Sequence, residues 1–518
     1  MNRQRIVPLA LGTAIALAGC VAGPNYHTPQ IPTPAHYAAA ASASGSATPA
    51  PAAAAAVDQA LWWHALHDPE LDSLIERAIS GNPDLAIALD RLQAARTFEA
   101  AIVGTVLPVA GASAGAGRGT GSDLTRGRAD QSLVSADNGA GLRRINEIGG
   151  FDAFWELDIF GKYRREIEAA RYDTQASLAA RNAVLIAVVA DVARAYVDMR
   201  GLQMRAAVLA AATGTLRESL RIVRIRYERG ITNELDVTLA SRELATLEAQ
   251  NAPVDAQVRA AQYTIATLLG RYPEELVQEL SAKQMVPQVS GAVEAGLPLD
   301  LLRRRPDIRQ AERELAGANA RIGIATANLF PSLAITAGIG EQRQAFGTTP
   351  SVSQHIWSVG PSLLWPLLDF GALDAQVEIA DLQTRALLIN YKQTIQGAVR
   401  EVDTSLDGFQ AQQLSLGKLG TALVASQRAV TLANERYQRG LTDFLNVVDA
   451  ERQEYEIEEQ YADAQVAVAE QFIALYRSLG GGWENYQALP PIHRPEPAII
   501  AAFQRVLSRD DSARIPAP

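Results

Sequence analysis

The sequence is poor in cysteine, in aromatic residues and in positive charge. A single cysteine among 518 residues rules out an intramolecular disulfide and a zinc site built on cysteines. Lys and Arg number 47 against 57 Asp and Glu, and this acidic balance argues against nucleic acid as the main partner. Aromatic residues make up only 6% of the chain, while alanine is abundant. This composition favours closely packed helices over an aromatic-rich β-sheet core.

Long hydrophobic runs are also missing beyond the amino terminus. Residues 1–19 have a basic start at Arg3 and Arg5, followed by the apolar stretch 6–17. That stretch is too short for a membrane-spanning helix and is typical of a secretory signal peptide. We find no later run of 18 apolar residues, so the sequence predicts that any membrane span is built from β-strands.

The one cysteine, Cys20, directly follows Leu17-Ala18-Gly19. This tetrad resembles the lipobox of bacterial lipoproteins, in which the cysteine becomes an acylated first residue carrying a diacylglycerol and an N-acyl chain. No aspartate follows Cys20, so the resemblance implies the outer membrane. Several acyl chains on one residue give stable anchoring. A signal peptide with an unmodified buried cysteine is the alternative. Residues 20–57 are rich in Pro, Ala and Ser, and are predicted to form an extended tether.

An internal repeat governs the rest of the chain. Tyr227-Glu228-Arg229-Gly230 recurs as Tyr437-Gln438-Arg439-Gly440, 210 residues later, and Phe160-Gly161 recurs as Phe370-Gly371 at the same offset. Such self-similarity indicates two copies of one structural unit in tandem. We assign the first copy to 58–280, a linker at mid-height (the equator) to 281–305, the second copy to 306–482, and a carboxyl-terminal equatorial segment or tail to 483–518.

Each copy is predicted to contain a short helix, a β-hairpin, a long proline-free helix and a returning helix. The ranges are 83–107, 105–158, 166–229 and 232–269 in the first copy, and 306–330, 332–364, 374–439 and 442–479 in the second. Gly230 and Gly440 are expected to end the long helices, because glycine readily takes the left-handed conformation found there. Thr232 and Thr442 are expected to cap the returning helices, and Pro253 to kink the first of them.

The lengths of these helices predict how they pack. The short and returning helices of one copy together nearly match its long helix, so two short helices stacked end to end can lie beside one unbroken helix. Each chain then supplies four strands at one end of a helical column, and four strands cannot close a barrel. Three chains supply twelve strands, an even number typical of membrane barrels. The predicted fold is mainly α, a trimeric helical barrel continuous with a 12-stranded transmembrane β-barrel.

Several motifs resemble one family. They are Gly23-Pro24-Asn25-Tyr26 after Cys20, Trp62-Trp63, Asn82-Pro83-Asp84-Leu85, and Leu301-Leu302-Arg303-Arg304-Arg305-Pro306-Asp307-Ile308. Over nearly the whole mature chain the sequence is similar to the outer-membrane efflux factors, the TolC-like exit ducts, and most closely to their lipid-anchored OprM- and NodT-like branch. The resemblance implies a passive homotrimer in the outer membrane that extends into the periplasm and exports drugs or other small molecules. Its implied partners are outer-membrane lipid, a periplasmic adaptor and an inner-membrane RND transporter. No enzymatic activity is implied, and no cofactor besides the acyl chains on Cys20.

The resemblance also implies a gate at the tips of the helical hairpins. Matching family positions carry an apolar constriction and an acidic ring, which correspond here to Leu445 and Asp449. Asp443 and Asn446 are further candidates for this gate. Tip-locking contacts correspond to Asp236 and Tyr437, whereas Thr442 stands where some members have a locking arginine. Without the resemblance, Asp443 and Asp449 read as surface acids stabilised by the dipole of the helix.

Three alternative functions follow from the same sequence. A duct for type I protein secretion would use the same tube. A structural periplasmic lipoprotein would have long helices and no pore. A lipoprotein hydrolase is suggested by Gly111-Ala112-Ser113-Ala114-Gly115, which matches the G-x-S-x-G pattern, although that motif needs a strand–turn–helix elbow and this segment is predicted to be strand. The sequence has no Walker-type phosphate-binding loop.

Charged and histidine-containing segments have both plain and functional interpretations. Arg217, Arg221 and Arg224 follow helical spacing near the first tip, and form either a solvated face or an adaptor-docking face. The run 303–305 is expected to form equatorial ion pairs rather than a ligand site. His64 and His67 have a metal-like spacing, but no carboxylate or cysteine cluster accompanies them, so we expect no metal.

Overall fold

The computed structural model describes residues 21–39, 58–120, 143–282, 284–289, 304–346 and 350–487. The predicted signal peptide, Cys20, residues 40–57 of the predicted tether, Arg303 and the tail beyond residue 487 lie outside these described residues. The described part is mostly helical with one small sheet, as the sequence predicts.

The two copies fold into matching series of elements. The first contains η1 (Gln59–Leu66), α3 (Pro69–Gly81), α4 (Pro83–Thr105), β1 (Val109–Thr120), β2 (Arg143–Leu157), α5 (Lys162–Glu228) and α6 (Glu234–Leu268), followed by the short turns η2 (Pro273–Glu275) and η3 (Glu279–Ser281). The second contains α8 (Pro306–Ala327), β3 (Ser332–Phe346), β4 (Val352–Leu364), α9 (Ala372–Gln438), α10 (Phe444–Leu479) and η4 (Glu484–Tyr486). Helices α5 and α9 have 67 residues each and keep the offset of 210 at both ends.

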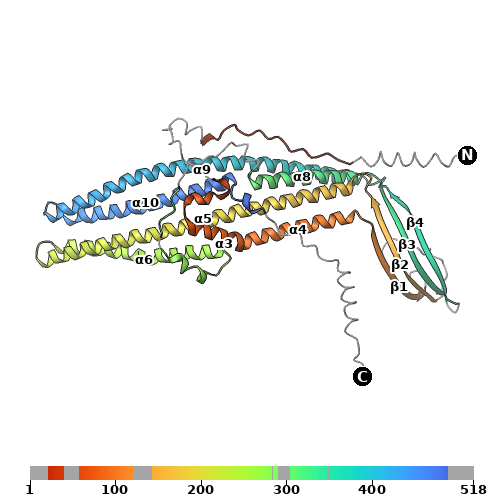
Figure 1. Cartoon of the computed structure of the whole chain (residues 1–518), viewed down its shortest axis with the longest axis horizontal. Coiled ribbons are helices and arrows are strands. Elements are labelled where there is room, and N and C mark those ends of the chain that lie inside the picture. The colour runs from red at the N-terminus through yellow and green to blue at the C-terminus, as the bar shows by residue number, and fades with distance from the viewer. Residues whose placement is uncertain are drawn as a thin grey trace, which may run out of the picture.

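The helices form a long column with the sheet at one end (Figure 1). At roughly 1.5 Å per residue, α5 and α9 are each about 100 Å long. Helices α8 and α10 lie one after the other between them, and α4 and α6 lie one after the other along the opposite side of α5 (Figure 1). Near the sheet the order across the layer is therefore α4–α5–α8–α9, and toward the tips it is α6–α5–α10–α9.

Glycines in the left-handed region mark the ends of the long helices. Gly161 and Gly371 precede α5 and α9 with φ of 81° and 84°, and Gly230 and Gly440 follow them with φ of 70° and 72°. A side chain strains this conformation, so glycine fixes the places where the chain reverses.

The caps of the returning helices differ from the prediction. Asn233 and Asp443, rather than Thr232 and Thr442, occupy the N-cap positions of α6 and α10. The Asn233 side chain accepts a hydrogen bond from the backbone N–H of Asp236, which satisfies a free donor in the first turn. Helix α6 runs as one element through Pro253.

The four strands form one antiparallel sheet in the order β1-β2-β3-β4. Strands β2 and β3 join the two copies, and they approach closely: a Cβ added to Gly150 would lie 2.6 Å from the carbonyl oxygen of Ile339. One face of the sheet carries a band of exposed apolar side chains that includes Phe151, Ile339 and Trp357, which are paired across β2, β3 and β4. The edges β1 and β4 have no partner strand among the described residues.

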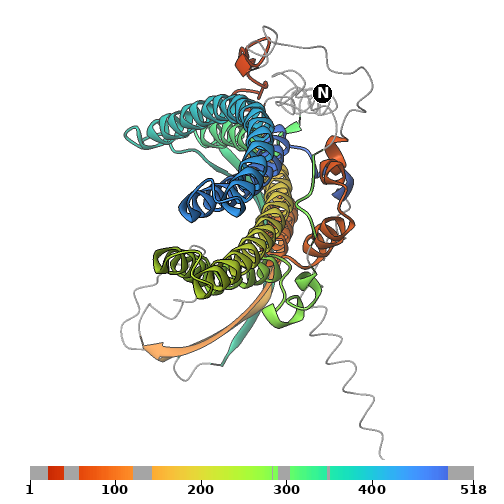
Figure 2. The ribbon, with the colours of Figure 1, turned by 90° about the vertical axis from the view of Figure 1, so that its left-hand side faces the viewer.

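The main hydrophobic core lies at mid-height, where the short helices meet. Trp62 and Trp63 of η1 are each 1% exposed and contact each other, and the Trp62 ring also contacts Phe472 and Tyr476 near the end of α10. The rings of Trp62 and Tyr476 stack with their centroids 5.9 Å apart. Figure 2 looks along the column and shows that the helical layer is curved, with η1 and α3 on its convex side. Aromatic burial therefore fixes the equator of the protomer.

Helix α5 passes a length-and-composition test for a membrane span, with an 18-residue window of mean hydropathy 1.6. The prediction concerns an unbroken run of 18 apolar residues, and α5 has none, because charged residues such as Arg181 and Asp191 interrupt its apolar stretch. However, 61% of that window is buried inside the protein, as in the core helix of a folded domain. Packing in the equatorial core accounts for its apolar residues, which include Leu185, Val189 and Val192.

The equatorial core gives a first test. Trp62→Ala removes a fully buried ring from between η1 and α10, and is expected to cost about 3–5 kcal/mol of stability. The control is Tyr272→Ala, since the Tyr272 side chain is 76% exposed and its loss is expected to cost less than about 0.5 kcal/mol. Thermal unfolding of both purified variants measures the difference, and equal stabilities would show that the aromatic cluster does not fix the equator.

Candidate functional site

The tips of the two helical hairpins are held together by a small apolar cluster. It contains one residue each from α5, α6 and α9 and three from the start of α10, namely Val223, Ala240, Tyr437, Phe444, Val447 and Val448. All six side chains are at most 7% exposed. This end of the column, which lies far from the sheet in Figure 1, therefore has a defined packed arrangement.

Tyr437 is the polar centre of this cluster. Its ring lies 5.2 Å from the ring of Phe444, and the guanidinium of Arg226 lies 4.5 Å from its centroid on the other hairpin. Burial raises the pKa of the Tyr437 hydroxyl, and the positive charge of Arg226 partly opposes that rise. The Arg226–Tyr437 contact joins the first copy to the second. The sequence does not indicate this contact, because α5 carries several arginines near its tip and nothing in their spacing distinguishes Arg226 from the others.

Asp236 takes a different partner from the predicted one. Its carboxylate accepts a hydrogen bond from the hydroxyl of Thr232 in its own hairpin, rather than serving as the direct partner of Tyr437. Its negative charge nevertheless reaches Tyr437 and contributes to the raised pKa of that hydroxyl. The two residues are thus electrostatic neighbours, and Arg226 supplies the contact across the hairpins.

The four predicted gate residues lie at the start and in the first two turns of α10. Leu445 is 56% exposed and projects away from the buried Phe444 and Val447. Asp449 lies one turn further on and accepts hydrogen bonds from Arg452 at 2.8 Å and Gln453 at 3.0 Å, both on its own helix. Because positions i and i+4 share a helix face, Leu445 and Asp449 lie on one exposed face of the protomer.

The other two gate candidates lie at the start of the same helix. Asp443 is the N-cap of α10, and its side chain makes no capping hydrogen bond. The Asn446 side chain donates a hydrogen bond of 2.7 Å to the hydroxyl of Thr442. Thr442, which the resemblance places where some family members have a locking arginine, is therefore bound to its own turn.

Basic residues near the first tip pair with acids. Arg217 contacts Glu248 of α6 at 2.7 Å, and Arg221 contacts Glu218 one turn earlier at 2.5 Å. All four side chains are largely exposed, so each ion pair contributes little to stability. This arrangement matches the solvated face that the helical spacing suggests.

Arg305 forms the equatorial ion pairs that the arginine run predicts. Its guanidinium contacts Asp307 at 2.6 Å and Glu401 of α9 at 2.8 Å, and donates to the backbone carbonyl of Ser478. It thereby links the start of α8 to α9 and to the end of α10. Arg304 instead donates a hydrogen bond to Gln59.

The described part of the predicted tether is bound rather than free. Arg165, whose side chain is 3% exposed, donates hydrogen bonds to the carbonyls of Ala22 and Gly23 and to the side chain of Asn25. Further along, the hydroxyl of Tyr26 donates to Glu312 at 2.8 Å. The composition predicted an extended segment correctly, but the polar partners that bind it lie 140 or more residues away in the sequence.

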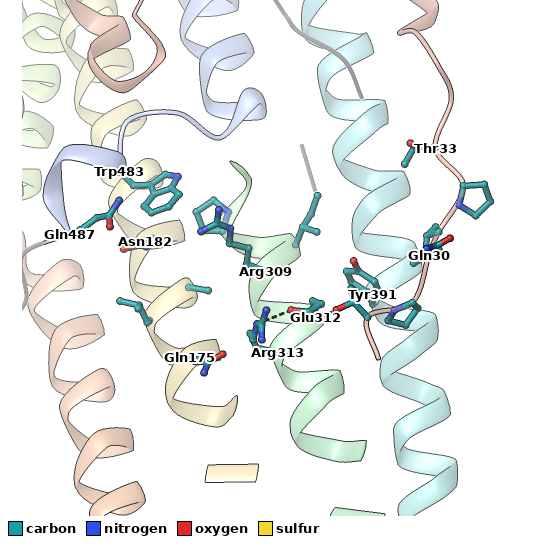
Figure 3. A pocket seen from close by; sticks show the side chains of 18 residues that line it. Gln30, Thr33, Gln175, Asn182, Arg309, Glu312, Arg313, Tyr391, Trp483 and Gln487 are labelled. Atoms are coloured by element: carbon teal, nitrogen blue, oxygen red, sulfur yellow. Dashed lines mark hydrogen bonds and ion pairs between the residues drawn. The ribbon is translucent and has the colours of Figure 1, made fainter. Parts of the chain in front are cut away.

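This bound segment, residues 21–39, forms one wall of a cavity of about 1350 Å³ (Figure 3). The opposite walls come from α5, α8 and the Trp483 region. Glu312 of α8 points toward Tyr391 of α9, whereas Arg309 and Arg313 lie on the other side of α8 (Figure 3). The guanidinium of Arg309 lies 5.1 Å from the centroid of the Trp483 ring. Glu312 contacts Arg313 at 2.8 Å and accepts from Tyr26, so the charges in this cavity are largely satisfied.

The hydrolase and metal hypotheses find no support in the geometry. Ser113 lies within strand β1 and pairs with Gly150, so its G-x-S-x-G segment lacks the elbow that nucleophilic catalysis needs. His64 lies 3.8 Å from Asp72. Among the residues that the structure describes, no group of three or more His, Cys, Asp or Glu side chains is placed to hold a metal ion.

Comparisons with known proteins agree with this architecture. The profile of the family described as Outer membrane efflux protein matches residues 74–271 and 297–481. Nodulation protein T of Rhizobium leguminosarum bv. trifolii is 29% identical, with 91% of this chain and 96% of that protein covered. The toluene efflux pump outer membrane protein TtgC of Pseudomonas putida is 30% identical over 91% of this chain and 94% of its own length. The solved structure of the outer-membrane channel OprN is 34% identical, with a TM-score of 0.78, and the match covers 90% of this chain and all of that one.

A helical column that carries a small antiparallel sheet at one end, built from two copies of one unit, defines the class of outer-membrane efflux channels. The chain belongs to the outer membrane efflux protein family.

The bound amino-terminal segment gives a second test. Arg165→Met keeps most of the side-chain volume but removes the donors that hold Ala22, Gly23 and Asn25. We expect residues 21–39 to become sensitive to added protease while the helical column resists it, because only the segment loses its contacts. Arg171→Met is the matched control, since Arg171 lies on the same helix with its side chain 64% exposed. Equal protection of the segment in both variants would show that Arg165 does not hold it.

Proposed function

We propose that three copies of this chain close into a passive duct in the outer membrane. Each protomer contributes four strands to a 12-stranded β-barrel and its helices to a periplasmic tube. The duct exports small molecules that a periplasmic adaptor and an inner-membrane RND transporter deliver to its tips. The open lateral edges of the protomer are the observation that carries this proposal.

Both lateral edges of the protomer expose backbone groups or apolar side chains that another chain could cover. In the sheet, β1 and β4 have free backbone groups along their outer edges among the described residues, and an open edge is not tolerated in lipid. In the helical layer, the outer helices expose apolar side chains, such as Phe98 on α4 and Ile379 on α9, at 57% and 54%. Pairing the α4 side of one copy with the α9 side of the next covers these residues and brings β1 to β4.

The sheet has the surface that a membrane barrel needs. Its exposed band, with Phe151, Ile339 and Trp357, is apolar, while the opposite face carries small and polar residues such as Gly338 and Ser358. Strands with lipid-facing and lumen-facing residues in alternation show this pattern. We infer that the apolar band faces lipid.

The lipid anchor is proposed to lie beside the base of the sheet. Val21 follows Cys20 directly and packs against Gly161, and the N–H of Ala22 donates to the carbonyl of Phe160 just beyond β2. A residue preceding Val21 lies within about 4 Å of it along the backbone. Acyl chains on Cys20 therefore enter the membrane next to the barrel rim.

The gate is proposed to lie at the α10 tips. Around a threefold axis, Leu445 supplies an apolar constriction and Asp449 an acidic ring, with Asp443 and Asn446 beside them. The Arg226–Tyr437 contact and the Thr232–Asp236 hydrogen bond are proposed to stabilise the arrangement of each tip. The adaptor opens the tips by displacing these hairpins.

Small molecules are the proposed cargo, since the name of the related TtgC specifies a toluene efflux pump. The duct itself lacks an energy source, and the driving force comes from the inner-membrane transporter. Specificity then depends mainly on that transporter.

If three chains pack side by side, a charge placed on the exposed apolar edge of one chain is expected to prevent the trimer from forming. Ile379→Asp puts a carboxylate on the apolar face of α9, where trimer contact would bury it, and burying an unpaired charge is costly. Detergent-solubilised wild type is expected to have three times the mass of its mature chain, and Ile379→Asp to be mainly a monomer. Tyr272→Asp, on an exposed equatorial side chain, is expected to stay trimeric.

The gate predicts a change in conductance. In planar bilayers the wild type is expected to pass little current, and the double variant Leu445→Ala with Asp449→Ala to pass several-fold more, because the constriction is removed. Arg242→Gln, at an exposed position on α6, serves as the control and is expected to behave as wild type. Unchanged conductance in the double variant would overturn the gate assignment, and no channel in any variant would overturn the duct.

A further inference from the structure

Helices α5 and α10 run antiparallel and form the seam between the two copies in the half of the column that carries the tips (Figure 1). Two ion pairs cross this seam: Asp191 contacts Arg477 at 3.3 Å, and Arg205 contacts Glu459 further toward the tips. Between them the helices come very close, because a Cβ added to Gly201 would collide with the side chain of Val466. The seam is thus a tight contact with charged pairs on either side.

The position between these ion pairs holds two acids. The ion pairs on either side and the Gly201–Val466 contact place Asp198 of α5 opposite Glu470 of α10 across the seam. Both are partly buried, and each stands about one helical turn from the Gly201–Val466 contact. A hydrogen bond between two carboxyl groups requires a proton on one of them.

Burial raises the pKa of both carboxyl groups. For Glu470 burial is the largest cause, the charge of Asp198 adds to it, and the pKa rises to about 7. For Asp198 burial again raises the pKa. Two carboxylates that face each other in a partly buried contact repel one another, so the two acids titrate as a coupled pair.

The neighbouring charges do not replace that proton. Arg194, one turn before Asp198 on α5, lowers the pKa of both acids, but only partly opposes burial. Helix α9 brings Arg400 and Glu401 into a cavity of about 520 Å³ that Arg194 also lines, and these two charges are of opposite sign. The charged groups around the pair therefore offset only part of the effect of burial, and the pKa of Glu470 stays above its ordinary value.

We propose that Asp198 and Glu470 form a proton-dependent latch between the two copies. With one shared proton the pair ties α5 to α10 at the equatorial end of the seam. When that proton is lost, two negative carboxylates face each other across a tight contact that leaves them little room to move apart. Their repulsion weakens the seam.

The sign of the effect follows from linkage. The ordinary pKa of glutamate is 4.5, and that of Glu470 is about 7 in the folded protein, so between these values the folded state binds more protons than the unfolded state. Stability therefore falls as pH rises from about 4.5 to 7 and levels off above the folded pKa. At neutral pH the latch is close to half protonated.

This inference extends to gating, and that step rests on the proposed duct. Helix α10 carries Leu445 and Asp449 at its other end, so a change in its contact with α5 acts on the helix that forms the gate. Deprotonation of the latch is expected to favour the open tip.

Thermal unfolding of the full-length protein tests the latch. Glu470→Gln keeps the shape and a hydrogen-bond donor but removes the titration. Between pH 5 and pH 8, wild type is expected to lose roughly 2–4 °C more in melting temperature than Glu470→Gln does. Glu459→Gln is the matched control: it breaks the ion pair with Arg205 on the same helix and is expected to keep the pH dependence of wild type. The same pH dependence in wild type and Glu470→Gln would overturn the latch.

Two further measurements keep the test independent of folding defects and of the duct. Amide hydrogen exchange of wild type in residues 460–479, corrected for intrinsic rates, is expected to be faster at pH 8 than at pH 6, and equal protection would overturn the latch.

In bilayers, wild type is expected to open more often at pH 8 than at pH 6, whereas Glu470→Lys, which forms an ion pair with Asp198, removes that difference. A pH-dependent seam with pH-independent opening would overturn only the link to the gate. The absence of any channel would count against the duct, while the melting curves still decide the latch.

Discussion

The structure depends on one constraint: backbone groups and apolar side chains at the two lateral edges of the protomer must be covered. In the four-stranded antiparallel sheet, the outer edges of β1 and β4 have no partner strand among the described residues, and hydrocarbon offers no hydrogen bonds to an open edge. The helical layer has the same incompleteness, with apolar residues exposed on α4 and α9. The edges of the sheet and the edges of the helical layer lie on the same two sides of the chain. One mode of assembly can therefore cover both.

The length of the helices makes the equator the mechanical centre of the protomer. Helices α5 and α9 are continuous, whereas α8 and α10 meet end to end between them, so the break needs its own support. The tryptophans of η1 fill one side of it, and Arg305 ties the start of α8 to α9 and α10 through charge-assisted hydrogen bonds. The Asp198–Glu470 pair lies just beyond this break, next to the part of α10 that packs in the equatorial core.

Much of this architecture follows from sequence periodicity. The 210-residue offset and the glycines at 161, 230, 371 and 440 located the long helices to within a few residues, because glycine marks positive φ and proline is absent between them. Long-range polar contacts were not predictable. Sequence spacing does not show which residues meet when distant segments pack together. It therefore could not predict that Arg165 binds the amino-terminal segment, that Thr232 is the partner of Asp236, or that the acids 198 and 470 face each other. The caps shifted by one residue because Asn233 competes with its neighbour Thr232 for the same role.

Direct imaging of the purified assembly by electron cryo-microscopy tests the central claim most directly. The account predicts a threefold particle in which β1 of one copy pairs with β4 of the next and α4 packs beside the neighbouring α9, around one continuous bore. A particle in which β1 and β4 pair within a single copy, or in which both edges remain open, would contradict it.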